Sequence, residues 1–205
     1  MRLYWIRHGE TDWNRARRLQ GRTDIPLNEN GVAVARATAA GMARVGLRFD
    51  RVYASPLARA RETAHLICPG QDVWVDERLR EMSFGALEGT CYRAVDQLPM
   101  PAPGGGESSE AVQRRVVSFL DEVTAGRTGA ERVLVSAHGA VIRSLLMYLK
   151  AIPHERFWEG TVSRNCGVTV LEAVGGRVSL LAEDVVFYGP DAWTGGRGSD
   201  DVPIL

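Results

Sequence analysis

The sequence predicts an α/β protein, a sandwich of helices around a mostly parallel sheet. Short apolar runs typical of buried strands alternate along the chain with stretches whose apolar residues recur at helical spacing. Such alternation is typical of parallel sheets whose connections are helices. No internal repeat and no change of composition divides the 205 residues. We therefore expect a single domain over residues 1–188 and a flexible tail over residues 189–205.

The first predicted strand is the apolar run Leu3–Ile6. A polar loop follows through residues 21–26, and a helix is expected from about Asn28, a residue type that often caps helices. Its apolar residues recur at helical spacing and are Val32, Ala35, Ala39 and Met42. The N-terminal segment is thus a strand, a long polar loop and a helix.

The second predicted strand is Arg51–Ala54. Ser55 and Pro56 then indicate a helix start with proline in the first helical position. Val73–Val75 predicts a third strand, and residues 77–88 are expected to be irregular.

The C-terminal half repeats this alternation after a loop rich in Pro and Gly at residues 99–106. A helix is expected from about Ser108, followed by the strand Val133–Val135 and a further helix after Gly139. Two runs separated by a Gly-Gly pair predict a terminal hairpin, Val168–Glu172 with Val178–Ala182.

Composition excludes several classes of protein. The formal net charge is zero, so no global field favours nucleic acid or an anionic membrane. The three cysteines contain no C-x-x-C pair, which argues against a disulfide framework and a structural zinc site. No stretch approaches a membrane-spanning length and no secretory leader precedes the first strand, so we expect a cytoplasmic protein, monomeric or homodimeric.

Charged and polar side chains follow the ends of the four predicted strands. In open α/β sheets, ligands bind beyond the carboxyl ends of the strands. A parallel sheet would therefore bring two arginines, two histidines and a carboxylate to one crevice; the residues at these ends are Arg7, His8, Ser55, Arg59, Glu77, Glu81, His138 and Gly139. Arginine forks and helix N-termini both suit a phosphate, so the sequence predicts a phosphate site.

Such a site also suggests a reaction. A neutral imidazole can attack the phosphorus of a phosphomonoester and form a phosphohistidine. Phosphoryl transfer requires mainly positioning and charge neutralisation, which arginines and a second histidine supply. A carboxylic acid would protonate the leaving alkoxide, and its carboxylate would then activate water.

Six blocks carry this chemistry: R-H-G-E-T-x-x-N at 7–14, L-Q-G-x-x-D-x-P-L at 19–27, S-P-L-x-R-A-x-E-T-A at 55–64, L-R-E-M-S-F-G-A-L-E-G at 79–89, G-G-E-S at 105–108 and S-A-H-G at 136–139. In these blocks the chain resembles the histidine phosphatase superfamily, which includes cofactor-dependent phosphoglycerate mutases and α-ribazole phosphatases. The resemblance is greatest to the α-ribazole and broad-specificity phosphatases, and it extends to about residue 173. It implies a three-layer α/β/α fold.

The resemblance also implies roles for nine residues. His8 would be the phosphorylated nucleophile and Glu81 the general acid and base. The phosphate pocket would consist of Arg7, Arg59 and His138. Secondary substrate contacts would come from Asn14, Gln20, Gly21 and the Gly139 backbone. No metal and no cofactor are implied.

Several of these positions have competitors in the sequence. Arg61 lies about 200° around the helix from Arg59, so only one of them can face the pocket well. Glu77 and Glu88 compete with Glu81, and Glu88 is the alternative for a supporting role. Glu107 and Ser108 are equally well explained as a helix start. The two other histidines, His65 and His154, are expected to be structural or exposed, and Trp13 lies near enough in sequence to line the pocket.

The segment between the fourth and fifth blocks bears on the reaction. Mutases of this family carry a longer insertion there, with basic residues that hold the substrate carboxylate. Here only Thr90–Pro103 separates the blocks, and Arg93 is its one basic residue. A short lid leaves the site open to water and favours hydrolysis. We therefore expect a phosphatase for α-ribazole 5′-phosphate, sugar phosphates, phosphoglycerates or nucleotides, with a phosphoglycerate mutase as the alternative.

Two hypotheses from other classes remain. A non-catalytic phosphate-binding module would have a damaged catalytic set, whereas all five candidate residues are present. A metal hydrolase would use the histidines and Glu81 as ligands, but the sequence lacks H-x-H and H-x-x-x-H spacing.

Overall fold

One central sheet organises the computed structural model, which describes residues 1–91, 102–127, 129–159 and 162–190. Within these residues the sheet has six strands in the order β3-β2-β4-β1-β5-β6. Four of them run parallel: β1 (Arg2–Arg7), β2 (Arg51–Ala54), β3 (Val73–Val75) and β4 (Arg132–Ala137). The predicted terminal hairpin, β5 (Val168–Val174) and β6 (Arg177–Val185), lies antiparallel beside β1. The mostly parallel sheet is thus confirmed.

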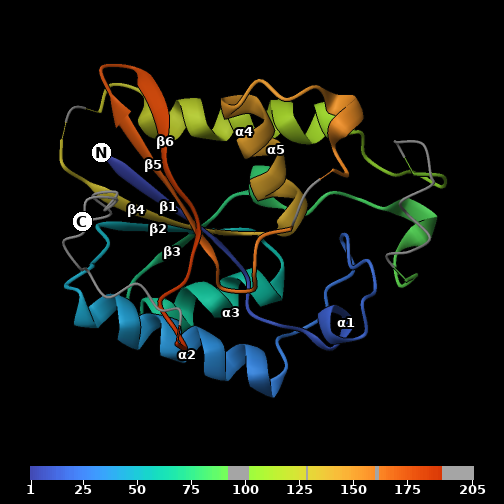
Figure 1. Ribbon diagram of the computed structural model, residues 1–205, viewed down its shortest axis with the longest axis horizontal. Helices are drawn as coiled ribbons and strands as arrows, with labels where there is room; N and C mark the ends of the chain where they lie inside the picture. The colour runs from blue at the N-terminus through green and yellow to red at the C-terminus, as the bar shows by residue number, and fades with distance from the viewer. Residues whose placement is uncertain (92–101, 128, 160–161, 191–205) are drawn as a thin grey trace.

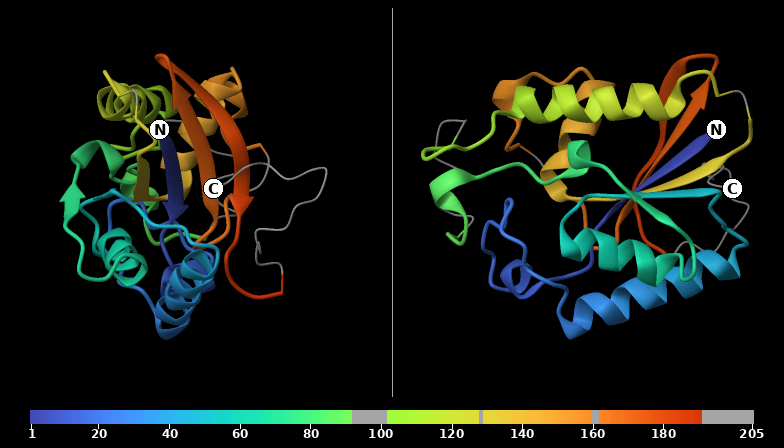
Figure 2. Two further views of the ribbon diagram at one scale, coloured as in Figure 1. Left: turned by 90° about the vertical axis from the view of Figure 1, so that its left-hand side faces the viewer. Right: turned by 180° about the vertical axis from the view of Figure 1, so that it is seen from behind.

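Helices cover both faces of this sheet, so the three-layer α/β/α architecture is also confirmed (Figure 1). Helices α2 (Glu29–Arg44) and α3 (Ala58–Ile67) lie on one face. Helices α4 (Ser109–Thr124) and α5 (Gly139–Leu149) lie on the other, and the views in Figure 2 show the same separation. The shorter helices are α1 (Asp12–Arg15) and the 3-10 helices η1 (Glu77–Leu79), η2 (Gly85–Leu87) and η4 (His154–Arg156).

Strand β1 lies between the two hydrophobic layers. Leu3 and Trp5 pack with α4 and α5, whereas Tyr4 and Ile6 pack with α2 and α3. All four side chains are fully buried, because successive residues of a strand point to opposite faces and both faces are covered. This explains why the first strand is a continuous apolar run.

Two helix starts agree with the sequence prediction. The Asn28 side chain accepts a hydrogen bond from the Gly31 N–H (2.8 Å) at the start of α2. The Ser108 side chain accepts one from the Ala111 N–H (3.2 Å) at the start of α4. Both satisfy backbone donors that a helix leaves free in its first turn.

The predicted start of α3 at Ser55-Pro56 is wrong. The helix begins at Ala58, and Leu57 is its N-cap residue without a side-chain cap bond. The Asp24 carboxylate accepts the Ala58 N–H instead (2.8 Å). The Ser55 hydroxyl lies 2.7 Å from Nε2 of His138 and accepts from the N–H of Leu57 (3.3 Å), which precedes the first helical residue. A residue 34 positions away thus supplies the cap, which local sequence could not indicate.

The parallel strands deliver their polar ends to one place. Arg7 of β1 is aligned with Ala137 of β4, and the His8 N–H donates to the Ala137 carbonyl (3.0 Å). His8 and His138 therefore follow adjacent strands at the same edge of the sheet. The carboxyl ends of these strands point toward the end of the molecule that carries α1 (Figure 1).

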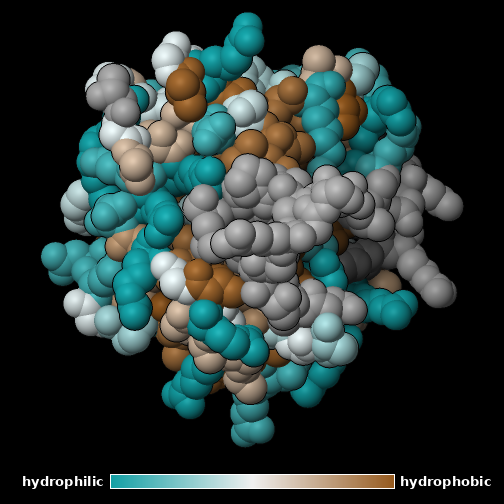
Figure 3. Space-filling view, turned by 60° about the vertical axis from the view of Figure 1, so that its left-hand side comes forward, coloured by the Kyte–Doolittle hydropathy of each residue, from teal (hydrophilic) through white to brown (hydrophobic). Residues whose placement is uncertain are grey.

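The surface of the described residues is mixed in polarity. On the face shown in Figure 3, separate apolar areas lie among hydrophilic residues. Among the described helices, none combines the length and the apolar character that crossing a membrane requires. Most of the short segment Thr90–Pro103 (residues 92–101) and most of the expected tail (residues 191–205) lie outside the described residues. The domain boundary at residue 188 stays a prediction.

The aromatic centre of the α4 layer tests this packing. Phe119 is fully buried and meets Trp5 edge to face, with ring centroids 5.6 Å apart. We expect Phe119→Ala to lower the free energy of unfolding by about 3–5 kcal/mol, because it removes buried surface and leaves a cavity. Urea unfolding of Phe119→Ala measures this. Val174→Ala, at a side chain that is 65% exposed, is the control and should change stability by less than about 0.5 kcal/mol. Equal effects of the two substitutions would contradict the assigned core.

Candidate active site

A cavity of about 200 Å³ opens at the carboxyl ends of the parallel strands. Eight of the nine predicted site residues line it: Arg7, His8, Asn14, Gln20, Gly21, Arg59, Glu81 and Gly139. The ninth, His138, lies behind His8, with the two ring centroids 5.2 Å apart. The structure therefore brings together residues that are as far apart as positions 7 and 139 in the sequence.

His8 is held as a neutral imidazole. Its side chain is buried, and Nδ1 lies 2.7 Å from the Gly9 carbonyl oxygen. A carbonyl only accepts, so Nδ1 must carry the proton and Nε2 keeps its lone pair. Burial lowers the pKa of His8 well below its ordinary value, and the nearby Arg59 and Arg7 lower it further. The result is an uncharged imidazole with a free lone pair on Nε2, between two arginines.

His138 is also neutral, for the same reasons. Burial first and then the Arg59 charge lower its pKa well below the ordinary value. Its Nε2 lies 2.7 Å from the Ser55 hydroxyl. Its Nδ1 is buried and has no hydrogen-bond partner among the described residues. If Nε2 accepts from Ser55, then Nδ1 carries a proton that is free to bind an anion.

The two arginines of the site are held by backbone carbonyls. Arg59 is fully buried and donates to the carbonyls of Gly21 (2.8 Å) and Thr23 (2.9 Å). Arg7 donates to the Ser163 carbonyl (2.6 Å). In both guanidinium groups the Nε atom is buried without a partner within the described part of the chain. Unpaired buried donors are costly, so this geometry suits an anion between them.

Glu81 is the buried carboxyl group that lines the cavity. Its Oε1 accepts from the Met82 N–H (2.9 Å), and its Oε2 lies 3.4 Å from the Ala140 N–H at the start of α5. Burial raises its pKa, although these N–H groups and the Arg59 charge oppose the shift. A carboxyl with a raised pKa can remain protonated and donate.

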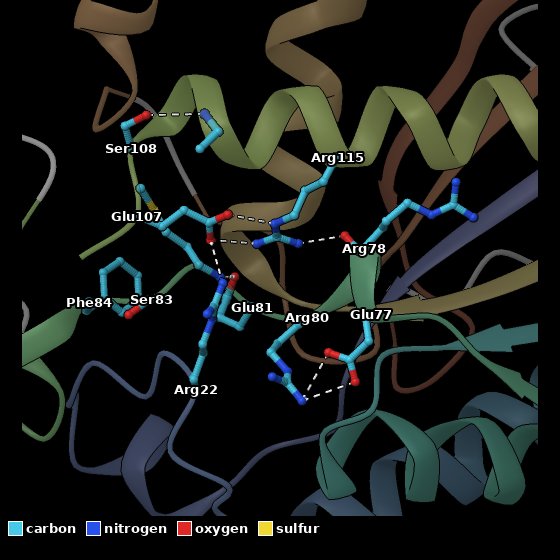
Figure 4. A network of polar contacts seen from close by, with 12 residues as sticks. Arg22, Glu77, Arg78, Arg80, Glu81, Ser83, Phe84, Glu107, Ser108 and Arg115 are labelled. Atoms are coloured by element: carbon cyan, nitrogen blue, oxygen red, sulfur yellow. Dashed lines mark hydrogen bonds and ion pairs between the residues drawn. The ribbon is translucent and has the colours of Figure 1, made fainter. Parts of the chain in front are cut away.

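An ion-pair network holds the segment that carries Glu81 (Figure 4). Arg115 of α4 donates to the Arg78 carbonyl (2.6 Å) and forms a bidentate pair with Glu107 (2.8 and 2.9 Å). The Glu107 N–H donates to the Ser83 carbonyl (2.8 Å). The segment is thus tied to α4 on both sides of Glu81. Of the two proposed helix-start residues, Ser108 is the cap and Glu107 is part of this network.

Glu88 occupies a supporting position beside the cavity. Its carboxylate accepts from the Arg22 N–H (2.9 Å), the Thr23 N–H (2.9 Å) and the Thr23 hydroxyl (2.5 Å). This fixes the loop whose carbonyls hold Arg59. Gly21, in that loop, has φ +54°, and a Cβ there would lie 2.1 Å from a Glu88 oxygen. Only glycine fits this close approach.

The competing residues lie elsewhere. Glu77 is exposed and pairs with Arg80 (3.1 Å). Arg61 and His65 are exposed on α3, and the His154 ring contacts the Ser109 hydroxyl (3.0 Å). Trp13 is not among the residues that line the cavity.

Sequence reasoning missed several groups that shape the site. The Thr63 hydroxyl accepts from the Gly9 N–H (2.9 Å) and donates to the Arg59 carbonyl (2.7 Å), so it joins two blocks. Asn165 donates to the His8 carbonyl (2.9 Å). Thr63 lies inside a family block and could have been found, whereas Asn165 lies outside all six. The other missed residues form the rest of the cavity wall: Leu19, Phe84, Ala140, Arg143, Phe157, Trp158 and Val162.

The described residues include no group of three His, Cys, Asp or Glu side chains that could hold a metal ion. The polar side chains Arg7, His8, Arg59 and Glu81 line one cavity.

The chain belongs to the histidine phosphatase superfamily (branch 1), whose family model matches residues 3–184. It is 33% identical over 181 residues to a 2,3-bisphosphoglycerate-dependent phosphoglycerate mutase of Methylobacterium sp. (strain 4-46), covering 77% of this chain and 87% of the relative.

Two solved structures have the same fold. A phosphoserine phosphatase from Entamoeba histolytica, in complex with 3-phosphoglyceric acid, has a TM-score of 0.78 and 27% identity, covering 90% of this chain and 97% of that one. A mycobacterial glucosyl-3-phosphoglycerate phosphatase, in complex with VO3, has a TM-score of 0.77 and 30% identity, covering 89% and 98%.

The two buried neutral histidines predict acid sensitivity. Below pH 6.5, the ordinary histidine pKa, the unfolded chain takes up protons that the folded chain does not. Stability should therefore fall as the pH decreases, by about 1.4 kcal/mol per pH unit for each such histidine. Glu81 has the opposite effect on stability. Its pKa is raised in the folded state, so as the pH falls the folded chain takes up this proton before the unfolded chain does, which stabilises the fold. Urea unfolding between pH 7 and 5 measures the net slope.

His138→Gln should reduce this slope by about one proton, that is about 1.4 kcal/mol per pH unit. His65→Gln is the matched control, since His65 is exposed, and it should leave the slope unchanged. An unchanged slope in His138→Gln would contradict the lowered pKa, because it would mean that His138 takes up its proton over the same pH range in the folded and unfolded chains.

Proposed function

We propose that the chain hydrolyses small-molecule phosphomonoesters through a phosphohistidine at His8 and without a metal ion. One observation supports this proposal above the others. The neutral, oriented imidazole of His8 lies beside Arg7 and Arg59, whose buried Nε donors lack partners in the described chain. A phosphate group would satisfy these donors and present its phosphorus to Nε2.

In the first step, Nε2 of His8 attacks phosphorus and the bond from phosphorus to the ester oxygen breaks. Protonated Glu81 gives its proton to that oxygen, so an alcohol leaves and Glu81 becomes a carboxylate. Arg7 and Arg59 donate to the phosphoryl oxygens and neutralise their charge, and the Nδ1–H of the neutral His138 adds a hydrogen bond. The backbone at Gly139, at the N-terminus of α5, adds a favourable dipole.

In the second step, water attacks the phosphohistidine. The Glu81 carboxylate accepts a proton from this water, the bond from phosphorus to Nε2 breaks, and inorganic phosphate leaves. His8 returns to its neutral form and Glu81 to its protonated form. Secondary contacts with the substrate come from Asn14, Gln20 and Gly21.

Two considerations favour hydrolysis over phosphoryl return to a bound acceptor. In the sequence, Thr90–Pro103 is a short connection between two family blocks, where mutases of the family carry a longer insertion with basic residues. Relatives of known fold include phosphatases of phosphoserine and of glucosyl-3-phosphoglycerate.

A phosphoglycerate mutase is the second candidate, because a curated relative at 33% identity is named as one. Sugar phosphates and α-ribazole 5′-phosphate are further substrate candidates.

A phosphomonoester screen in EDTA tests the proposed reaction. We expect hydrolysis of several small phosphomonoesters without added metal. His8→Ala should lower kcat by at least about 10³-fold, because it removes the nucleophile. Quenched wild-type enzyme should carry acid-labile, base-stable phosphate.

His65→Ala is the control and should retain full activity. Full activity in His8→Ala would exclude His8 as nucleophile. Loss of activity in EDTA with recovery on metal addition would support a metal hydrolase, whereas phosphate binding without turnover would indicate a non-catalytic module. A mutase assay with 3-phosphoglycerate and its bisphosphate cofactor distinguishes the second candidate.

The proton donor is tested by changing the leaving group. Glu81→Gln keeps the size of the side chain and removes the acid. Its kcat should fall by roughly 10²–10⁴-fold for alkyl phosphates, which need protonation. The decrease should be much smaller for p-nitrophenyl phosphate in single-turnover phosphorylation. Equal slowing with both esters would contradict the acid role.

A further inference from the structure

Asn165 lies outside the cavity but contacts two residues that line it. It precedes β5, and the N–H of the next residue, Cys166, donates to the Arg7 carbonyl at the end of β1 (2.9 Å). Nδ2 of Asn165 lies 2.9 Å from the His8 carbonyl oxygen and 3.3 Å from Oδ1 of Asn14. Asn165 itself is not among the residues that line the cavity, so it can act on a bound substrate only through these two neighbours.

The orientations of both side-chain amides follow from their partners. The His8 carbonyl only accepts, so Nδ2 of Asn165 must face it. The Thr11 N–H only donates, so Oδ1 of Asn14 must face Thr11 (3.2 Å), and the same oxygen accepts from Asn165. The NH2 group of Asn14 then has no hydrogen-bond acceptor within the described residues. Because Asn14 lines the cavity, this NH2 group is available to a phosphate oxygen.

The peptide group between His8 and Gly9 is held on both sides. Its carbonyl accepts from Asn165, and its N–H donates to the Thr63 hydroxyl (2.9 Å). These two bonds fix the plane of the peptide and thereby help to direct the next carbonyl, that of Gly9, toward Nδ1 of His8 (2.7 Å). The bond at Nδ1 determines which ring nitrogen carries the proton. Asn165 therefore influences both the position and the tautomer of the His8 ring.

The turn that carries Asn165 is itself strongly constrained. The Asp184 carboxylate of β6 accepts from the Arg164 N–H (2.8 Å) and pairs with the Arg164 guanidinium (2.9 Å). The Tyr188 hydroxyl donates to the Asn165 carbonyl (2.9 Å). Cys166 is fully buried with φ +56°, a conformation that residues other than glycine adopt only where their surroundings impose it. A side chain on a turn held in this way can fix the groups that it contacts.

We propose that Asn165 is a positioning residue, whose amide holds the His8 backbone and the Asn14 side chain in one fixed geometry. The attacking nitrogen and a donor to the phosphate are thereby placed relative to each other. Such alignment matters, because a displacement of about 1 Å can slow a reaction by about 10²-fold. This inference rests on the proposed phosphohistidine reaction at His8.

The rate of phosphoenzyme formation in a single turnover tests this role. Asn165→Ala should slow it by roughly 10- to 100-fold, because His8 loses its alignment. Tyr188→Phe is the matched control in the same turn: it removes a bond to the Asn165 backbone, keeps the Asn165 side chain and should slow the step less than about threefold. Asn30→Ala removes an exposed amide that contacts Glu10 (3.2 Å) and should leave the rate unchanged.

A second substitution at the same position guards against a loss of folding. Asn165→Asp keeps the shape of the side chain but places an oxygen against the His8 carbonyl, so it should slow phosphorylation at least as much as Asn165→Ala. Thermal unfolding of each variant reports its folding, and rates are compared for the folded proteins.

The tautomer of His8 is a readout that does not require turnover. Nitrogen NMR of labelled histidine distinguishes a proton on Nδ1 from one on Nε2, and the spectrum of His8→Gln identifies the His8 signals. We expect the Nδ1–H form in the wild-type chain and in Tyr188→Phe, and a mixture of both tautomers in Asn165→Ala.

Binding of inorganic phosphate tests the contact with Asn14. By calorimetry, Asn165→Ala and Asn14→Ala should each weaken binding by roughly 3- to 10-fold, the range of one hydrogen bond. The double substitution should bind no more weakly than Asn14→Ala alone, since Asn165 acts on the phosphate through Asn14.

The outcomes separate this role from the proposed reaction. A rate within about threefold of wild type in Asn165→Ala, an equal slowing in Tyr188→Phe, an unchanged His8 tautomer or fully additive losses of phosphate binding would each overturn the positioning role. Absence of phosphoenzyme in the wild-type chain would overturn the proposed function. A changed tautomer and coupled phosphate binding in the same proteins would still support the positioning of His8 and Asn14 by Asn165.

Discussion

The fully buried guanidinium of Arg59 is the interaction on which the rest of the site depends. A buried cation must be compensated, and here backbone carbonyls of Gly21 and Thr23 do so in place of a carboxylate ion pair. Such compensation works only if the loop is rigid, and the Glu88 carboxylate makes it rigid by accepting three of its donors. The Nε of Arg59 then remains unpaired and available to an anion.

The ionisation of the neighbouring groups follows from this positive charge and from burial. Both effects disfavour imidazolium, so His8 and His138 are neutral. Burial disfavours a carboxylate at Glu81 more than the Arg59 charge favours it, and its pKa rises. The proposed reaction requires a neutral His8 and a protonated Glu81, and both pKa shifts favour these forms. The same environment thus lowers the pKa of the two histidines and raises the pKa of Glu81.

A structural feature could be predicted from the sequence when the residues that produce it are neighbours in the sequence. Asn28 and Ser108 were correctly identified as caps because a cap bonds within its own helix. The start of α3 was misplaced because Asp24, distant in sequence, caps it while His138 engages Ser55. The choice among Glu77, Glu81 and Glu88 rested on resemblance alone. Their surroundings separate them: one is exposed, one lies in the cavity, and one holds a loop.

By itself, the sequence determined the order of strands and helices, the parallel character of the sheet and the set of residues at the strand ends, because periodicity and motif blocks are local properties. Only the tertiary structure decided which donors remain unpaired and which ionisation states result, and it alone placed Arg143 in the cavity wall. The burial and the hydrogen bonds of a side chain depend on segments that meet only when the chain has folded. The pKa values of the cavity residues depend in turn on this burial and on these hydrogen bonds.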